Sequence, residues 1–196
     1  VIIQHRCNTK QQLCDLPSSL GVEVDIRSEG SKLIVHHDAF QKGEGFDQWL
    51  EGYNHNYLIL NVKEDGLESS LLSLMEKNHI ENFFFLDQTF PSIVKMVERG
   101  EKRCAVRVSE FESIETALKL AGKIDWVWVD YFTYFPLTSS DAEHLKSAGF
   151  RLCLVSPELQ GFSNPSTAIS LLEKVRTLDI EVSAVCTKFP DLWLPY

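Results

Sequence analysis

The chain has 196 residues, of which 44% are hydrophobic and 24% are charged, so it has the size and composition of a folded globular domain rather than of a disordered or fibrous protein. Its formal net charge is −9 and it has no extended run of Lys or Arg. This excludes broad nucleic-acid binding, because neutralising many phosphates requires a basic surface. The apolar stretches are strand-sized, well short of the roughly 20 residues that cross a bilayer, so no transmembrane segment is expected.

The five cysteines are an odd number, and Cys104, Cys153 and Cys186 fall in runs typical of buried strands. Buried free cysteine behaves as a small hydrophobe, so a reducing, cytoplasmic setting is predicted. The sequence starts at Val1 without Met, which leaves a removed signal peptide open. In an exported protein, Cys7 and Cys14 are the pair available for a disulfide.

Short runs of β-branched and aromatic residues recur about every 20 to 25 residues along the chain, each followed by a segment with helical spacing. The predicted strands are residues 1–4, 22–26, 58–62, 82–86, 104–108, 126–129, 151–155 and 182–186. Amphipathic segments with helix start and stop signals predict helices at 67–77, 92–100, 113–122, 139–149 and 164–178. Residues 33–36 predict a hairpin extension after the second strand, and 40–56 an irregular stretch with a helical turn at 47–51.

Eight β/α units predict a compact (β/α)8 TIM barrel formed by residues 1–196 as a single domain. The runs 83–86 and 126–129 are apolar at every position, as in parallel strands that are covered on both faces. An open doubly wound sheet gives the same local signals. No Gly-rich phosphate-binding turn follows the first strand, which favours the barrel.

In a barrel of this kind, functional groups lie at the carboxyl ends of the strands. Glu23 and Asp25 are two residues apart on a strand, so both carboxylates point to one face. Such close negative charges require a cation or a proton between them, and Mg²⁺ or Ca²⁺ is the natural partner for oxygen ligands. His5 and a histidine at 36 or 37 supply the base and the acid that phosphodiester cleavage requires.

The later strand ends carry a second set of candidate substrate-binding residues, Arg107, Glu110 and Tyr131. Arg107, Ser109 and Glu110 are placed to contact a sugar or another polyol, although surface ion pairing explains them equally well. Tyr131 and Phe132 follow an unusually aromatic strand, where packing in the core is the simpler explanation and stacking on a ligand the alternative. Cys7 lies beside the proposed histidine site and is weighed as a nucleophile.

The motifs IQHR at 3–6, GVEVDIR at 21–27 and IVHHD at 34–38 resemble, in order and spacing, the opening motifs of glycerophosphodiester phosphodiesterases, within the phospholipase C-like phosphodiesterase superfamily. The run TKFPDL at 187–192 is similar to the segment that ends the last strand in that family. The dense part of the resemblance covers about the first 63 residues.

The resemblance implies a metal-dependent phosphodiester hydrolase that acts on a small polar phosphodiester. It implies that His5 and His37 are the acid-base pair and selects His37 over His36. It further implies that Arg6 and Lys63 contact the phosphate. The implied metal ligands are Glu23, Asp25 and Asn61.

The sequence departs from the family pattern in three places. Asn61 stands where the family usually has a third carboxylate, which predicts lower metal affinity or a different preferred ion. After Arg6 the run Cys-Asn-Thr-Lys at 7–10 replaces the usual Gly and a later Pro-Glu-Asn-Thr, so a glutamate ligand is missing. The insertion that often shapes the substrate entrance is reduced to residues 40–56. Two alternatives therefore stay open: a non-catalytic barrel that binds phosphate or a phosphosugar, and a lyase that forms a cyclic phosphate. No pattern in the sequence indicates an oligomeric state.

Overall fold

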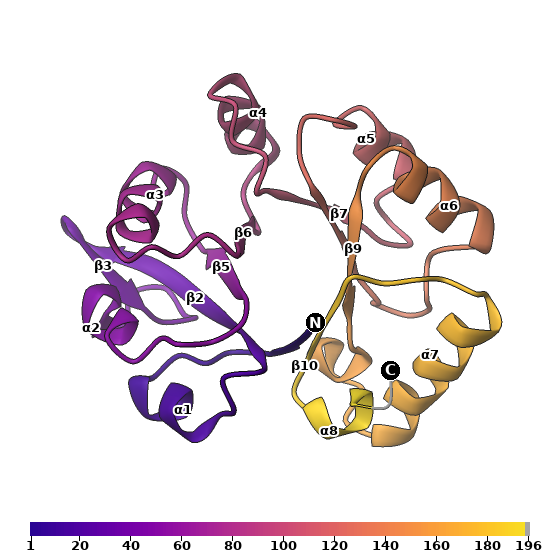
Figure 1. Cartoon of the computed structure of the whole chain (residues 1–196), viewed down its shortest axis with the longest axis horizontal. Coiled ribbons are helices and arrows are strands. Elements are labelled where there is room, and N and C mark those ends of the chain that lie inside the picture. The colour runs from indigo at the N-terminus through magenta and orange to yellow at the C-terminus, as the bar shows by residue number, and fades with distance from the viewer. Residues whose placement is uncertain (195–196) are drawn as a thin grey trace.

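The structure is a computed structural model that describes residues 1–194, and in it strands alternate with helices along the chain (Figure 1). The strands are β1 Ile2–Gln4, β2 Gly21–Glu29, β3 Lys32–Val35, β4 Glu44–Gly45, β5 Leu58–Val62, β6 Phe83–Leu86, β7 Ala105–Val108, β8 Trp126–Val129, β9 Arg151–Val155 and β10 Ala184–Thr187. The helices are α1 Lys10–Asp15, α2 Phe46–Leu50, α3 Glu68–Lys77, α4 Phe90–Glu98, α5 Ile114–Leu118, α6 Ser139–Ser147, α7 Pro165–Thr177 and α8 Pro190–Trp193, with a short 3₁₀ helix at Pro157–Gln160.

Eight of the strands pair in parallel, in the order β6-β5-β2-β1-β10-β9-β8-β7. The strands at the two ends of this path, β6 and β7, are connected by one isolated parallel bridge between Phe85 and Cys104. The remaining two strands are antiparallel: β3 pairs with β2, and β4 pairs with β3. The chain therefore has a mixed α/β fold with the alternating order of a TIM barrel.

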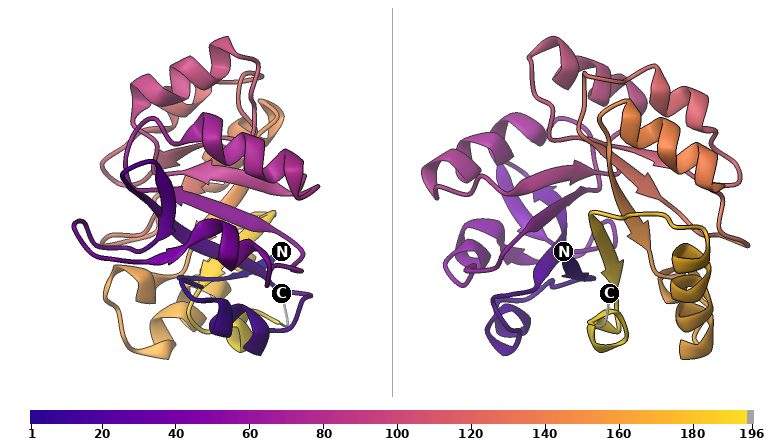
Figure 2. Two further views of the ribbon diagram at one scale, coloured as in Figure 1. Left: turned by 90° about the vertical axis from the view of Figure 1, so that its left-hand side faces the viewer. Right: turned by 45° about the vertical axis from the view of Figure 1, so that its right-hand side comes forward.

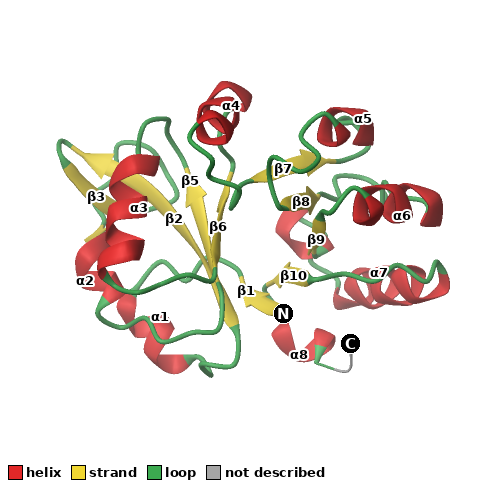
Figure 3. Cartoon of the chain, turned by 45° about the horizontal axis from the view of Figure 1, so that its top comes forward, coloured by secondary structure: helices red, strands yellow, loops and turns green. Residues whose placement is uncertain are grey.

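The helices lie outside the strands, as Figures 2 and 3 show from several sides. Their starts follow local sequence signals, because the first N–H groups of a helix require an acceptor from outside the helix. Thr89 caps α4, Asn164 caps α7, and Thr138 forms a capping box with Asp141 at the start of α6. These polar residues fix where each helix begins after its strand.

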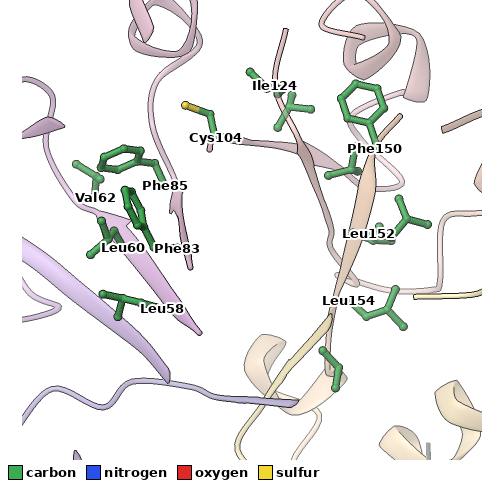
Figure 4. Packing of buried hydrophobic residues seen from close by; sticks show 14 of the residues in the cluster. Leu58, Leu60, Val62, Phe83, Phe85, Cys104, Ile124, Phe150, Leu152 and Leu154 are labelled. Atoms are coloured by element: carbon green, nitrogen blue, oxygen red, sulfur yellow. The ribbon is translucent and has the colours of Figure 1, made fainter. Parts of the chain in front are cut away.

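Hydrophobic side chains form two separate clusters, one on each side of the strand layer. The larger cluster packs the strands against the helices, and Figure 4 shows parts of it: Leu58, Leu60, Val62, Phe83 and Phe85 near β5 and β6, and Ile124, Phe150, Leu152 and Leu154 near β9. The smaller cluster consists of Ile3, Tyr57, Ile59, Phe84, Leu86, Ala105, Trp126, Trp128, Cys153, Val155, Ala184 and Cys186. Because these residues alternate along their strands with members of the larger cluster, they fill the inner face. On that face β2 places Glu23 and Asp25 instead.

The structure contains all eight strands expected from the sequence, as well as the hairpin after β2 and the helical turn near residue 47. It differs in detail: β2 extends three residues further, to Glu29, where it pairs with β3, and α5 ends at Leu118. The short helices α1 and α8 and the 3₁₀ helix were not expected. No helix within residues 1–194 is long and apolar enough to cross a membrane.

Candidate functional site

The carboxyl ends of the parallel strands carry a group of charged side chains. β1 is followed by His5 and Arg6, β5 by Lys63, and β6 by Asp87. Arg6 and Asp87 have left-handed backbones, with φ of 55° and 60°. Such conformations are unfavourable for residues other than glycine and are concentrated at functional sites.

Glu23 and Asp25 lie in β2 before the part that pairs with β3, and both are fully buried. The register places Asp25 beside Asn61 of the parallel strand β5. Glu23 Oε1 accepts a hydrogen bond from Asn61 Nδ2 at 2.7 Å, and its Oε2 accepts one from the Arg6 backbone N–H at 2.7 Å. Burial, followed by the nearby charge of Asp25, nevertheless raises the pKa of Glu23 to about 7.

Two cations and an amide hold Asp25. Lys63 Nζ lies 3.0 Å from its Oδ1, and Arg6 Nε lies 3.6 Å from its Oδ2. Asn8 forms two hydrogen bonds with Asp25. Its Nδ2 donates to Asp25 Oδ2 at 2.8 Å, and its Oδ1 accepts a hydrogen bond from the Asp25 backbone N–H at 3.0 Å. The sequence prediction missed Asn8. Its position three residues after His5 was the one available signal.

His5 lies next to Glu23, with 3.8 Å between His5 Nε2 and Glu23 Oε2, and only 12% of its side chain is exposed. Burial, followed by the positive charge of Arg6, lowers the pKa of His5 to about 3. The imidazole is therefore neutral at pH 7, and its buried Nδ1 has no hydrogen-bond partner. A neutral imidazole has a free lone pair for a proton, and an anionic substrate bound beside it would raise its low pKa toward the range of a general base.

His37 lies on the segment after β3, where its Nδ1 is 2.7 Å from Asp38 Oδ1. Its carbonyl oxygen accepts a hydrogen bond from Arg27 Nε at 3.0 Å, which ties the segment to β2. Within residues 1–194 no hydrogen bond or ion pair connects His37 with Glu23 or Asp25. The structure thus gives His37 a carboxylate partner of its own.

Cys7 is buried at 1% exposure, and burial followed by the charge of Glu23 raises the pKa of its thiol to about 12. A protonated, inaccessible thiol is not a nucleophile. Its carbonyl oxygen accepts the indole N–H of Trp49 at 2.8 Å, so the residue anchors the segment after β1. Cys7 and Cys14 are both free thiols.

The oxygen atoms near Glu23 are of the type that a hard divalent cation binds, but there are too few of them for a complete ligand set. In the described part of the chain, no cluster of three or more His, Cys, Asp or Glu side chains is arranged to hold a metal ion. Glu23 and Asp25 nevertheless supply carboxylates, and Asn61 Oδ1 is buried without a partner, which leaves an oxygen free for a cation. Lys63 competes with such an ion for Asp25.

A chain of ion pairs continues around the strand ends from Lys63. Lys63 Nζ lies 3.4 Å from Asp87 Oδ2, and Asp87 also pairs with Arg107. Arg107 Nη1 lies 3.2 Å from Asp130, which accepts a hydrogen bond from Gln160 Nε2 at 2.7 Å. The Asp87–Arg107 pair adjoins a cavity of about 590 Å³ between β6 and β7, which is a usual size for a small-ligand site.

The other two candidate substrate-binding residues contact neighbouring loops. The Glu110 carboxylate accepts hydrogen bonds from the backbone N–H groups of Phe132, Thr133 and Tyr134 and from the Thr133 hydroxyl. The ring of Tyr131 packs edge-on against Phe162, with 5.4 Å between the ring centroids. Of the three residues, Arg107 is therefore the one that the structure connects to the site.

Comparison of the sequence with protein-family models and with curated proteins finds no match. Comparison of the fold with solved structures does. A glycerophosphodiester phosphodiesterase from Agrobacterium tumefaciens C58 aligns with 100% of this chain and 99% of its own, with a TM-score of 0.68 at 13% identity. A glycerophosphoryl diester phosphodiesterase from Parabacteroides distasonis aligns with 98% of this chain and 84% of its own, with a TM-score of 0.66 at 12% identity. The fold of this chain is thus similar to that of glycerophosphodiester phosphodiesterases over its whole length.

Proposed function

We propose that this protein is a phosphoric diester hydrolase of the glycerophosphodiester phosphodiesterase type, acting on a small polar phosphodiester. One observation carries the proposal: His5 lies 3.8 Å from the buried Glu23 at the strand ends of a chain with this fold. The cations Arg6 and Lys63 lie beside them on Asp25. A base, buried carboxylates and cations are the groups that phosphodiester cleavage requires.

The proposed reaction has two steps. A substrate hydroxyl next to the phosphoester attacks phosphorus and gives its proton to His5, which burial keeps neutral. The bond to the departing alcohol breaks, and His37, supported by Asp38, protonates the alcohol oxygen. In the second step water opens the cyclic phosphate and both proton transfers run in reverse, so that each histidine regains its starting form.

Arg6 and Lys63 stabilise the negative charge that develops on the phosphoryl oxygens. The residues that would hold a divalent cation, Mg²⁺ or Ca²⁺, are Glu23, Asp25 and Asn61. A bound cation would supply further stabilisation of that charge. We expect the alcohol part of the substrate to occupy the cavity beside Asp87 and Arg107, where charged groups can bind its hydroxyls.

In this proposal the eight parallel strands form a closed barrel, and residues 1–196 act as a single domain. Two observations support closure of the barrel. The inner cluster contains side chains from β6 and β7 as well as from the strands between them, and the bridge at Phe85 joins the two ends of the strand path. The five free cysteines support a cytoplasmic location, since free thiols are typical of a reducing compartment.

The experiment is hydrolysis of a panel of glycerophosphodiesters and an aryl phosphodiester with Mg²⁺, Mn²⁺ or Ca²⁺. We expect turnover by the wild type, and losses of at least about a hundredfold in His5→Ala and His37→Ala. Activity that is absent from the wild type, or unchanged in both variants, contradicts the proposal. Phosphorus NMR of the product separates full hydrolysis from a lyase that stops at the cyclic phosphate.

The second candidate function is a non-catalytic phosphate- or phosphosugar-binding protein. The hydrogen bond from Asn61 to Glu23 favours it, because an amide replaces a charged ligand there. Tight calorimetric binding of a phosphodiester without turnover would establish this alternative.

A further inference from the structure

The carboxyl end of β10 places a lysine beside His5. Gln4 of β1 pairs in register with Thr187 of β10, and the His5 backbone N–H donates to Thr187 O at 2.9 Å. Lys188 therefore follows Thr187 on the strand adjacent to the one that carries His5. Its charge contributes to the lowered pKa of His5, after the larger effects of burial and Arg6.

Lys188 differs from the other two cations near His5 in its partners. Arg6 and Lys63 both pair with Asp25. Lys188 Nζ instead donates to the carbonyl oxygen of Glu158 at 3.4 Å, and in the part of the chain that the structure describes it forms no ion pair with a carboxylate. Within residues 1–194 its ammonium group thus has no direct ion pair, because the nearby Glu158 carboxylate bonds the backbone N–H of Lys188 instead.

A buried carboxylate fixes the backbone at this lysine. The Glu158 side chain belongs to a residue that is 5% exposed, and it accepts hydrogen bonds from the Ser156 hydroxyl, from Thr187 Oγ1 at 2.6 Å and from the Lys188 N–H at 2.8 Å. A buried carboxylate is stable only when its oxygens are hydrogen-bonded in this way. Glu158 therefore ties the turn after β9 to the end of β10.

We propose that Lys188 binds the phosphate of the substrate next to His5 and that Glu158 is its positioning residue. The inference rests on the proposed phosphodiester site and adds one ligand to it. A phosphodiester anion has one negative charge shared by two oxygens, and the cations already paired with Asp25 gain less from binding it than an unpaired ammonium does. Lys188 thus provides the charge that attracts the anion into the site.

The test is calorimetric binding of dimethyl phosphate, a phosphodiester anion with no hydroxyl for internal attack, in the presence of a chelator. In Lys188→Gln we expect about tenfold weaker binding, and in Lys188→Arg binding close to wild type. Lys123→Gln is the matched control, because among the described residues Lys123 Nζ also bonds only to a carbonyl, that of Lys119 at 3.2 Å, before the start of β8. Its affinity should equal that of the wild type.

Equal affinity in Lys188→Gln and the wild type overturns the proposal, as does an equal loss in Lys123→Gln or a wild type that does not bind dimethyl phosphate. A wild type that binds through Lys188 but hydrolyses no phosphodiester contradicts the proposed enzyme and leaves the Lys188 site standing. If the wild type hydrolyses a phosphodiester but Lys188→Gln binds dimethyl phosphate equally well, the proposed enzyme stands and the Lys188 site is refuted.

The positioning role of Glu158 has a separate readout. Glu158→Gln should weaken dimethyl phosphate binding when Lys188 is present and change it little in the Lys188→Gln background. A purely structural role would lower the melting temperature and weaken binding equally in both backgrounds. Thr187→Val removes only one of the three donors and serves as the second variant if Glu158→Gln does not fold.

Discussion

Asn61 Nδ2 donates a hydrogen bond to Glu23 Oε1 at 2.7 Å, while the other polar atom of its side chain, Oδ1, is buried without a partner. An aspartate at this position would place a third carboxylate beside Glu23 and Asp25. The carboxylates would repel one another unless a cation neutralised them. In the proposed metal site, the choice of amide or acid at residue 61 would thus set how strongly a metal ion is required.

We expect Asn61→Asp to bind Mg²⁺ or Ca²⁺ at least about tenfold more tightly than the wild type, because a third charged oxygen ligand is added. Without metal the variant should melt at a lower temperature, and Ca²⁺ should restore the loss. Calorimetry and thermal unfolding measure the two effects. Asn82→Asp, on the exposed segment before β6, is the control, and equal metal affinity in all three proteins would refute the expectation.

Asp38→Asn should lower kcat by about tenfold or more with little change in KM, because the carboxylate at 2.7 Å orients the His37 ring. The measurement is steady-state kinetics on the phosphodiester that the wild type hydrolyses best. Asp15→Asn is the control: Asp15 accepts a hydrogen bond from Gln11 on the exposed helix α1. A change in KM alone would mean that Asp38 binds substrate instead.

Without metal, the stability that Glu23 contributes should fall as the pH rises from about 4.5 to 7. The sign follows from the pKa of about 7 in the folded protein and 4.5 as the ordinary value. In that window the unfolded chain has lost the proton and the folded chain retains it, so raising the pH favours unfolding. Relative to Glu23→Gln, the wild type should lose about 3 kcal/mol of unfolding free energy as the pH rises across the window. A constant difference would show that Glu23 stays ionised.

Glu110→Gln should destabilise the protein at pH 7 by about 1 kcal/mol or less, since solvent screens this partly exposed group. Although burial opposes the effect, hydrogen bonds from Thr133 and its neighbours lower the pKa of Glu110 to about 2. The stabilisation by Glu110 is therefore complete above pH 4.5 and is lost as the pH falls toward 2. Chemical unfolding at pH 7 and pH 2.5 tests this. A loss of activity at unchanged stability would instead support substrate binding by Glu110.

The sequence predicted the parts of the fold that depend on local patterns. Strands apolar on both faces, such as Phe83–Leu86, and the carboxylate spacing of Glu23 and Asp25 follow from periodicity alone. The short helix α1 escaped prediction although Thr9 and Gln12 form a capping box, because six residues give too little periodicity to detect.

The contacts that depend on strand order could not be predicted. Arg107 was expected to act with Glu110, which is close in sequence, but it pairs with Asp87 and Asp130, which directly follow β6 and β8. The burial of Glu158 is a second case, because two of its three donors come from the distant end of β10. Such pairs are set by tertiary packing and leave no periodic signal in one sequence.

The isolated bridge at Phe85 and Cys104 has a consequence for motion. Most neighbouring strands are joined by a ladder of residue pairs, whereas β6 and β7 share this one bridge. Local opening costs least where the fewest hydrogen bonds must break, so we expect the strand layer to open first at this seam and its amide hydrogens to exchange fastest there. The cavity beside Asp87 and Arg107 lies along the same seam. The space proposed for the substrate alcohol would therefore have an adjustable wall, and we expect alcohols of different size to fit there without disturbing the buried carboxylates of β2.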